Sequence, residues 1–434
     1  MTSPRTAYIN ARLLDPASGL DAPGGLLAED GRIADLGPGL FTDGAPDGVR
    51  VVDCGGHCLA PGLVDMRVTL CEPGHEHKET IASVGRAAAA GGVTSLACLP
   101  NTDPPLDTGA GLEFIARRAR EAKGVKIFAY ACATRGAEGR DLAEMGLLAE
   151  AGAVAVSDGH RAIADTLVMH RALSYAAGFD LLVVQHPEEP RLADGGAMNA
   201  GQTATRLGLP GIPPQAEAMM IERDVRLLEL SGARYHAAHL STAAAVEAVR
   251  AAKRRGLTVT CDTAPPYFAL TEVDVGDYRT FAKLSPPLRG EMDRRAVVAG
   301  LADGTIDVIA SDHVPHDQDS KRLPFELAEP GIVGLETLLP LALELYHNGR
   351  IGLLDLLAKL TVTPADLLRV PAGRLATGGP ADLVLFDLDA PWKIAVDRFR
   401  GKSKNSPFDG RPVAGHVLRT VVDGRTVFKR SAEG

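Results

Sequence analysis

Short apolar runs alternate with longer helical stretches through the middle of the chain. The stretches between the runs are rich in Ala, Leu and Arg. This rhythm is typical of an α/β protein in which strands and helices alternate around a parallel sheet. The number of candidate strands, about eight, is the number that closes a (β/α)8 TIM barrel. The candidate strands are LVDMRV at 63–68, TSLACLP at 94–100, KIFAYACA at 126–133, AVAVSD at 153–158, DLLVVQH at 180–186, RYHAAHL at 234–240, TVTCDT at 258–263 and DVIASDH at 307–313.

Both ends of the chain have a different pattern, in which shorter strand-like runs are broken by Gly, Asp and Pro. AYINARLLD lies near the N-terminus, and GHVLRTVVDGRTVFKR lies near the C-terminus. An Asp-Gly pair between two such runs is typical of a hairpin turn. We therefore predict a small β-sandwich formed from both chain ends, residues 1–60 and 368–434, beside a barrel at residues 61–367.

The composition is that of a globular protein with a large core. The 434 residues are 45% apolar and carry a formal net charge of −9. No apolar run approaches the ~18 residues of a membrane span, and the N-terminus lacks the apolar segment of a secretory signal. We therefore expect a cytoplasmic protein with no membrane partner. The acidic balance and the 4% of aromatic residues also argue against a nucleic-acid partner.

The cysteines have neither the density of a disulfide framework nor a Cys-x-x-Cys pair. We expect most of them to be buried thiols. They are Cys54, Cys58, Cys71, Cys98, Cys132 and Cys261.

Polar side chains end several of the predicted barrel strands, where a (β/α)8 barrel places its catalytic groups. A single Asp or His at such a position commonly caps the next helix or bonds a loop amide. Four Asp and His residues that end four different strands favour a shared site instead. These four are Asp158, His186, His239 and Asp312, and Asp65 and Asn101 lie at two further strands.

Two imidazoles and two carboxylates at one barrel mouth suit a zinc ion, because neutral His nitrogens and carboxylate oxygens are its usual ligands. Bound zinc lowers the pKa of a coordinated water toward ~7, and an Asp can then take the proton. Because this combination hydrolyses amides, the pattern predicts a zinc-dependent amide hydrolase.

The order of several motifs carries a family resemblance over essentially the whole chain. The motifs are PGLVDMRVTLCEPGHEHKET at 61–80, GGVTSLACLPNTDPP at 91–105, VVQHPEE at 183–189, HAAHLST at 236–242, LSPPLR at 284–289, IDVIASDHVPH at 306–316 and GIVGLETLLPLALE at 331–344. In this order they resemble the dihydroorotases of the amidohydrolase superfamily. The resemblance implies a metal-dependent barrel with a small β-sandwich, and reversible ring closure of N-carbamoyl-aspartate to dihydroorotate in pyrimidine synthesis. Allantoinases and hydantoinases fit less well, since they usually have a bridging Lys where this chain has SDG.

The same resemblance implies roles for individual side chains. Asp312 would be both a metal ligand and the general base. Asp158 would be the acidic metal ligand in place of the bridging Lys, at a position where such dihydroorotases often have two adjacent acids. The remaining implied residues are the metal ligands His186 and His239, the substrate-carboxylate residue Asn101 and the substrate neighbour His316.

The first metal motif of the family is absent from this chain. Dihydroorotases have His-x-His-x-Arg after the strand-end Asp, and the same positions here hold Arg67, Thr69 and Cys71. Arg keeps its proton at any useful pH, so Arg67 cannot ligate a cation and would repel one if it points inward. Arg67 is therefore a candidate for binding a substrate anion directly.

Two further departures affect the same pocket. Pro266 and Tyr267 stand where the family has a Pro-His-His or Pro-Asn-His pattern, and Ser285 stands where it usually has Asn. These changes lie at three places around one pocket, whereas the other motifs match the family. They therefore indicate altered function.

Three functions remain open. The chain is a dihydroorotase-like protein of pyrimidine biosynthesis with a degenerate site that holds at most one zinc ion and has weak activity or none. Alternatively, it is a noncatalytic assembly partner of aspartate carbamoyltransferase, a role proposed for dihydroorotase homologues that lack the His-x-His motif. A further alternative is a single-metal hydrolase of another cyclic amide or ureide. We expect a small-molecule substrate if the chain is active, and a homo-oligomer.

Overall fold

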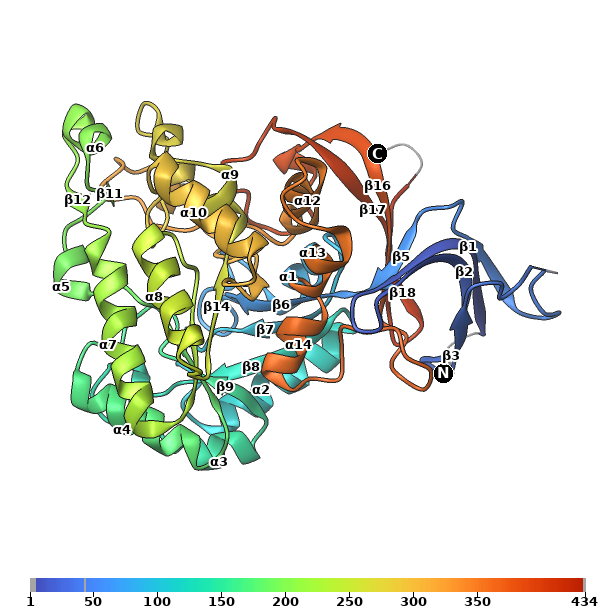
Figure 1. Cartoon of the computed structure of the whole chain (residues 1–434), viewed down its shortest axis with the longest axis horizontal. Helices are drawn as coiled ribbons and strands as arrows, with labels where there is room; N and C mark the ends of the chain where they lie inside the picture. Colours follow the sequence, from blue (N-terminus) through green and yellow to red (C-terminus); the bar gives the residue numbers. More distant parts are fainter. Residues whose placement is uncertain (1–4, 43, 432–434) are drawn as a thin grey trace.

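The computed structural model of the protein describes residues 5–42 and 44–431. Its two parts are a barrel ringed by helices and a mixed β-sheet built from both ends of the chain, and they lie side by side (Figure 1). Within the described residues, no helix is both long enough and apolar enough to cross a membrane. The six cysteines are all buried free thiols, as predicted.

The barrel is a ring of eight parallel strands, in the order β6, β7, β8, β9, β10, β13, β14 and β15. The ring closes where Val68 at the end of β6 bridges His313, and where the Thr69 N–H donates to the His313 carbonyl at 2.9 Å. Each of the eight predicted runs overlaps one of these strands, so the predicted (β/α)8 barrel is confirmed. Their bounds are β6 Leu63–Val68, β7 Val93–Cys98, β8 Lys126–Ala131, β9 Ala153–Val156, β10 Leu182–Gln185, β13 Arg234–Ala237, β14 Val259–Thr263 and β15 Val308–Ile309.

The barrel strands are buried on both faces. All six residues of β6 and all six of β7 are buried, as expected for parallel strands that face helices on one side and the barrel interior on the other. Apolar side chains fill that interior, among them Met66, Val184 and Tyr130. The Tyr130 hydroxyl donates to the Met66 carbonyl at 2.7 Å, so its polar end is satisfied inside the core.

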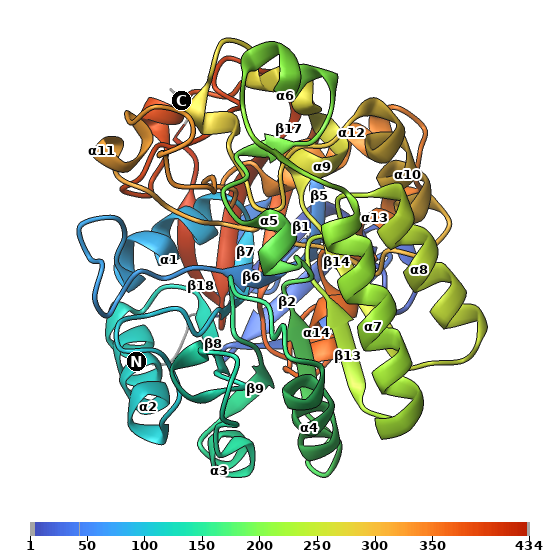
Figure 2. The ribbon, with the colours of Figure 1, turned by 90° about the vertical axis from the view of Figure 1, so that its left-hand side faces the viewer.

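Helices surround the strands on the outside of the barrel (Figure 2). Several begin at a polar cap: the side chains of Thr80, Thr108, Asp165 and Thr242 accept backbone N–H groups from the first turns of α1, α2, α4 and α8. The helices are α1 Ile81–Ala90, α2 Gly109–Ala122, α3 Met145–Glu150, α4 Thr166–Ala177, α5 Pro190–Ala193, α6 Gln202–Leu207, α7 Gln215–Ser231, α8 Ala243–Arg254, α9 Pro265–Ala269, α10 Glu291–Ala302, α11 Gln318–Lys321, α12 Leu338–His347, α13 Leu353–Ala358 and α14 Val362–Leu368.

The second sheet joins the two chain ends, with strand order β18, β17, β16, β5, β1, β2 and β3, and with β4 also paired to β1. Leu59 of β5 pairs with Leu13 of β1 on one side and with Leu385 of β16 on the other. This pairing fits the β-sandwich predicted from both ends; the exact domain limits stay a prediction. The strands are β1 Thr6–Asp15, β2 Leu20–Glu29, β3 Arg32–Gly37, β4 Arg50–Asp53, β5 Cys58–Pro61, β16 Leu383–Lys393, β17 Pro412–Val422 and β18 Arg425–Lys429, and the short strands β11 Met198–Asn199 and β12 Gly211–Ile212 pair separately.

Candidate functional site

Four of the predicted site residues meet in one hydrogen-bonded chain at the C-terminal ends of the barrel strands. Arg67 Nε donates to Asp312 Oδ1 at 2.8 Å, and His239 Nδ1 lies 3.1 Å from Asp312 Oδ2. His239 Nε2 in turn lies 2.7 Å from Nδ1 of His186. These residues come from β6 and from the ends of β10, β13 and β15, so the barrel brings distant segments of the chain together.

Arg67 is a buried cation that points into the barrel mouth. Its side chain is only 1% exposed. Among the described residues, no group accepts a hydrogen bond from its Nη1 or Nη2. Buried donors without a partner are costly, and a guanidinium suits the bidentate binding of a carboxylate. Two of its nitrogens therefore have no acceptor among the described residues.

The charges of the site favour an ionised Asp312 beside a neutral His239. Burial acts to raise the pKa of Asp312, but His239 and Arg67 outweigh it, so the pKa lies below its ordinary value. Burial, reinforced by the charge of Arg67, lowers the pKa of His239 to about 4. Arg67 and Asp312 therefore form an ion pair, and both oxygens of Asp312 are engaged by protein groups.

Asp158 does not join this group. Its Oδ2 accepts from the Thr134 hydroxyl at 2.5 Å, and its Oδ1 accepts from the Thr134 N–H at 2.9 Å. Burial raises the pKa of Asp158 above its ordinary value. The carboxylate thus fixes the loop after β8, and its predicted role as a metal ligand stays a prediction.

The donors arranged in this way do not fit a zinc ion. The carboxylates of Asp312 and Asp158 are bound to protein groups, the two imidazoles bond each other, and the guanidinium of Arg67 brings a fixed positive charge. Across residues 5–42 and 44–431, no group of three or more His, Cys, Asp or Glu side chains has an arrangement that could hold a metal ion. Zinc binding by His186, His239 and Asp312 stays a prediction, and a second ion has no ligands in the first motif.

His160 is a site residue that the sequence analysis missed. The ring Nε2 of His160 lies 3.0 Å from the Thr69 hydroxyl, and its backbone N–H donates to Asn101 Oδ1 at 3.2 Å. Burial, and then the charge of Arg67, lowers the pKa of His160 to about 3, so the ring is neutral. The signal was its position two residues after Asp158, in the same strand-end loop. Gly159 between them is required, because a Cβ there would overlap the Asn101 side chain.

Both polar atoms of the Asn101 side-chain amide form hydrogen bonds with this loop. Besides accepting from the His160 N–H, it donates through Nδ2 to the Asp158 carbonyl at 3.4 Å. Its predicted contact with a substrate carboxylate stays a prediction.

Glu188 and Tyr267 also border the His186–His239 pair, and their roles were not predicted. Glu188 Oε2 accepts from the Ser285 hydroxyl at 3.0 Å and lies 3.6 Å from His186 Nε2. Tyr267 is buried with its ring centroid 6.5 Å from that of His239, and its hydroxyl donates to the Pro286 carbonyl at 2.9 Å. The substituted positions Tyr267 and Ser285 therefore line the same site, which gives the departures seen in the sequence a common location.

His316 and Cys71 lie outside the bonded chain. His316 Nε2 lies 2.9 Å from the Pro330 carbonyl, and its Nδ1 lies 3.3 Å from Lys78 Nζ. Burial lowers the pKa of His316 to about 3 and raises that of the Cys71 thiol to about 12. Both groups are uncharged at neutral pH, and neither replaces the guanidinium that dihydroorotases have at position 71. The predicted substrate contact of His316 stays a prediction.

Comparisons with known proteins agree with the resemblance. A family model described as dihydro-orotase-like matches residues 56–245. The chain is 50% identical to a dihydroorotase of Anaplasma phagocytophilum over 429 residues, which covers 98% of this chain and 95% of that protein. The chain belongs to the dihydroorotase family. A dihydroorotase of Pelobacter propionicus is 47% identical over 97% of this chain and 99% of its own length.

The fold of this dihydroorotase-family chain is also similar to that of solved structures. An L-hydantoinase (dihydropyrimidinase) from Arthrobacter aurescens matches with a TM-score of 0.88 and 26% identity, over 99% of this chain and 97% of that one. The predicted barrel with a sheet from both chain ends is therefore confirmed. Within this fold, a buried arginine now stands in the motif where the family has its first metal-binding histidines.

Proposed function

We propose that this dihydroorotase-family chain belongs to pyrimidine biosynthesis and has a degenerate site with weak dihydroorotase activity or none. The observation that carries the proposal is the ion pair between Arg67 and Asp312. A general base must meet the proton it removes within hydrogen-bond reach and with a pKa near the working pH. Asp312 has a lowered pKa, and both of its oxygens are engaged by Arg67 and His239, which makes it a poor base.

The proposal includes at most one zinc ion per chain. His186, His239 and Asp312 could hold such an ion only if they released their present hydrogen bonds to one another. A dihydroorotase centre uses zinc to activate water, and here Arg67 supplies a fixed positive charge without that chemistry.

A small anionic ligand remains compatible with the mouth. The Nη1 and Nη2 atoms of Arg67 have no acceptor among the described residues, and a substrate carboxylate would satisfy both. Asn101 is the second residue that we propose for this ligand. Binding without efficient turnover is the behaviour that this arrangement supports best.

The second candidate is a noncatalytic assembly partner of aspartate carbamoyltransferase. It is favoured by the contrast between a complete eight-stranded barrel and a mouth that has lost its first metal motif. A barrel that is retained without its first metal motif suits a structural role. Hydrolysis of another cyclic amide or ureide with a single metal is a third possibility. In each case we propose a cytoplasmic protein that forms a homo-oligomer.

A turnover assay with the purified full chain tests the main proposal. Dihydroorotate hydrolysis is followed with added zinc, in the wild type and in Asp312→Ala. We expect the wild-type rate to be close to that of the variant. Turnover typical of enzymes, with a kcat of about 1 s⁻¹ or more that Asp312→Ala abolishes, would overturn the proposal. Activity on a different cyclic ureide, lost in Asp312→Ala, would favour the third candidate.

A further inference from the structure

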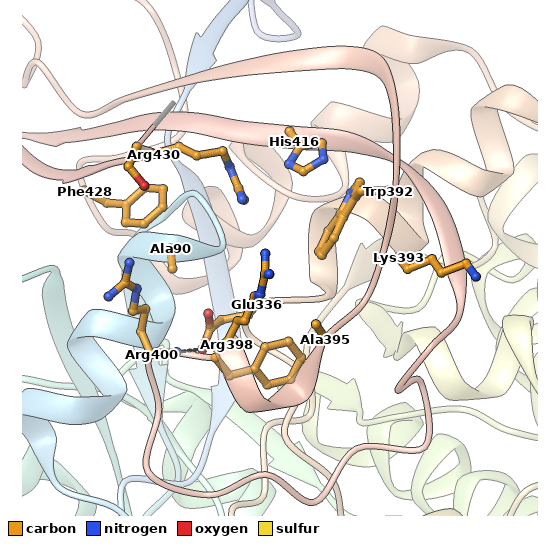
Figure 3. A pocket seen from close by; sticks show the side chains of 12 residues that line it. Ala90, Glu336, Trp392, Lys393, Ala395, Arg398, Arg400, His416, Phe428 and Arg430 are labelled. Atoms are coloured by element: carbon orange, nitrogen blue, oxygen red, sulfur yellow. Dashed lines mark hydrogen bonds between the residues drawn. The ribbon is translucent and has the colours of Figure 1, made fainter. Parts of the chain in front are cut away.

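A cavity lies between the barrel helices and the C-terminal sheet. Its volume is about 310 Å³, and it is lined by residues of α1, β16, β17, β18 and the segment 395–400. It has no lining residue in common with the bonded chain of the barrel mouth. The cavity is therefore a separate place in the fold (Figure 3).

Positive charge is concentrated around this cavity in a chain whose formal net charge is −9. Four basic residues line it, Lys393, Arg398, Arg400 and Arg430, against one acid, Glu336. Figure 3 shows the side chains of Arg398 and Arg430 reaching into the cavity from opposite sides. In the part of the chain that the structure describes, the guanidinium groups of Arg398 and Arg400 form no ion pair. Arg430 is engaged differently: its Nε donates to the Val417 carbonyl at 2.9 Å, and its guanidinium carbon lies 5.9 Å from the centroid of the Trp392 ring. The guanidinium of Arg398 therefore gives the cavity a positive group suited to binding an anion.

Flat apolar surfaces lie beside these charges. The rings of Trp392, Phe399 and Phe428 line the cavity. The Trp392 Nε1–H donates to the Gly415 carbonyl at 2.9 Å, which fixes the orientation of the indole. The His416 ring lies 4.7 Å from it between centroids, and among the described residues the buried Nδ1 of His416 has no hydrogen-bond partner. An aromatic wall with an unpaired polar atom suits a heterocyclic ring.

Glu336 holds the arginine-bearing segment in place. Its Oε1 accepts from the Arg400 N–H at 2.6 Å and from the Gly401 N–H at 3.2 Å. Burial raises the pKa of Glu336 to about 7. A fraction of the Glu336 carboxyl groups is therefore neutral at physiological pH, and Glu336 offsets less of the positive charge of the arginines. The basic character of the cavity is thus built into the fold.

We propose that this cavity binds a single nucleotide of the nucleoside monophosphate class. Its phosphate would pair with the guanidinium of Arg398, and its base would lie against the aromatic rings that line the cavity. Base–aromatic stacking and guanidinium–phosphate pairing are the two recognition modes that the lining offers. The volume is at the lower end of the ~300–1,000 Å³ of small-molecule pockets, which fits one nucleotide better than a dinucleotide.

The chain provides its own reporter for this site, because Trp392 is its single tryptophan. The test titrates the full chain with uridine 5′-monophosphate and with adenosine 5′-monophosphate, and follows tryptophan fluorescence and binding heat. We expect a change in fluorescence with at least one of the two. Uridine without phosphate, and inorganic phosphate without a base, are expected to bind at least about tenfold more weakly, since each lacks one recognition mode.

Variants separate this site from a general attraction of anions. Arg398→Gln is expected to weaken nucleotide binding by about tenfold, the effect of one lost charge-assisted contact. Arg206→Gln, on α6 and also exposed, is the matched control and should leave binding unchanged. The proposal is overturned if neither nucleotide binds below about 1 mM, if phosphate or uridine alone binds as tightly, or if both arginine variants act alike.

Discussion

The Nε atom of Arg67 donates to Oδ1 of Asp312 across 2.8 Å, with both side chains buried at the mouth of the barrel. The family motif has a histidine at position 67, and this chain has a residue that cannot lose its proton. The acid that the family resemblance assigns as general base is therefore paired with an internal cation. This relationship determines most of what we expect of the site.

Asp312→Asn is expected to destabilise the fold by about 3 kcal/mol, because it leaves the guanidinium of Arg67 buried without its negative partner. Urea unfolding of the full chain measures this, with Asp194→Asn as a control at an exposed acid. The double variant Arg67→Met/Asp312→Leu should recover most of the loss, since an apolar pair needs no charge compensation. A single variant as stable as the wild type would contradict an ionic pair.

Zinc content provides a second check. After incubation with excess zinc and gel filtration, the wild-type chain should retain no more than one ion, because the first motif contributes no imidazole. Elemental analysis of the filtered protein measures the ratio. Replacing His186 with Ala should remove any ion that is retained, whereas His77→Ala, at an exposed histidine, should have no effect. Two tightly held ions in the wild type would contradict our interpretation of the site.

The sequence predicted the fold well because parallel strands are buried on both faces and leave continuous apolar runs. The run at 63–68 became β6 with every residue buried, and the run at 126–133 contains β8. The number of strands predicted a closed ring but not its closing contact, which is a backbone bridge between Val68 and His313.

The site was predictable only in part. Strand ends identified His186, His239 and Asp312, because a barrel gathers the ends of its strands at one mouth. The bonding partners of these residues depend on side-chain direction, which residue spacing does not specify. Asp158 follows its strand like the others, but its carboxylate accepts a hydrogen bond from Thr134. His160, two residues later in the same loop, lies against Thr69 instead.

The stability of the chain should depend on pH through Glu336. Burial raises its pKa from 4.5 to about 7, although Arg400, Lys404 and Arg430 face it. The folded state therefore holds this proton more tightly than the unfolded state. Its contribution to stability is fully present below pH 4.5 and is lost as the pH rises through about 7.

Glu336→Gln isolates this contribution, because the amide oxygen can still accept the N–H groups of Arg400 and Gly401. Urea unfolding at a series of pH values should show the variant gaining stability relative to the wild type between about pH 5 and 8. Glu326→Gln, at an exposed acid, serves as the control. A constant difference across this range would mean that Glu336 titrates normally.

The proposed assembly role predicts a stable complex with aspartate carbamoyltransferase. When the two purified proteins are mixed, size-exclusion chromatography should show a peak earlier than either alone. Asp312→Ala should co-elute equally well if it remains folded, because the interaction would depend on the barrel surface and not on the mouth. Two unshifted peaks at micromolar concentrations would count against this role.

Restoring the first metal motif tests our proposal that Arg67 limits the dihydroorotase activity of this chain. The triple variant Arg67→His/Thr69→His/Cys71→Arg removes the buried cation, frees Asp312 and supplies two imidazoles and the guanidinium of the family motif. We expect zinc content and dihydroorotate hydrolysis to rise together, the latter by about 10²-fold or more, as is typical when a positioned acid–base group becomes functional. The variant Thr69→His/Cys71→Arg, which keeps Arg67, is the matched control and should stay near the wild-type rate. If the control gains as much activity as the triple variant, the ion pair with Asp312 is not the feature that limits turnover.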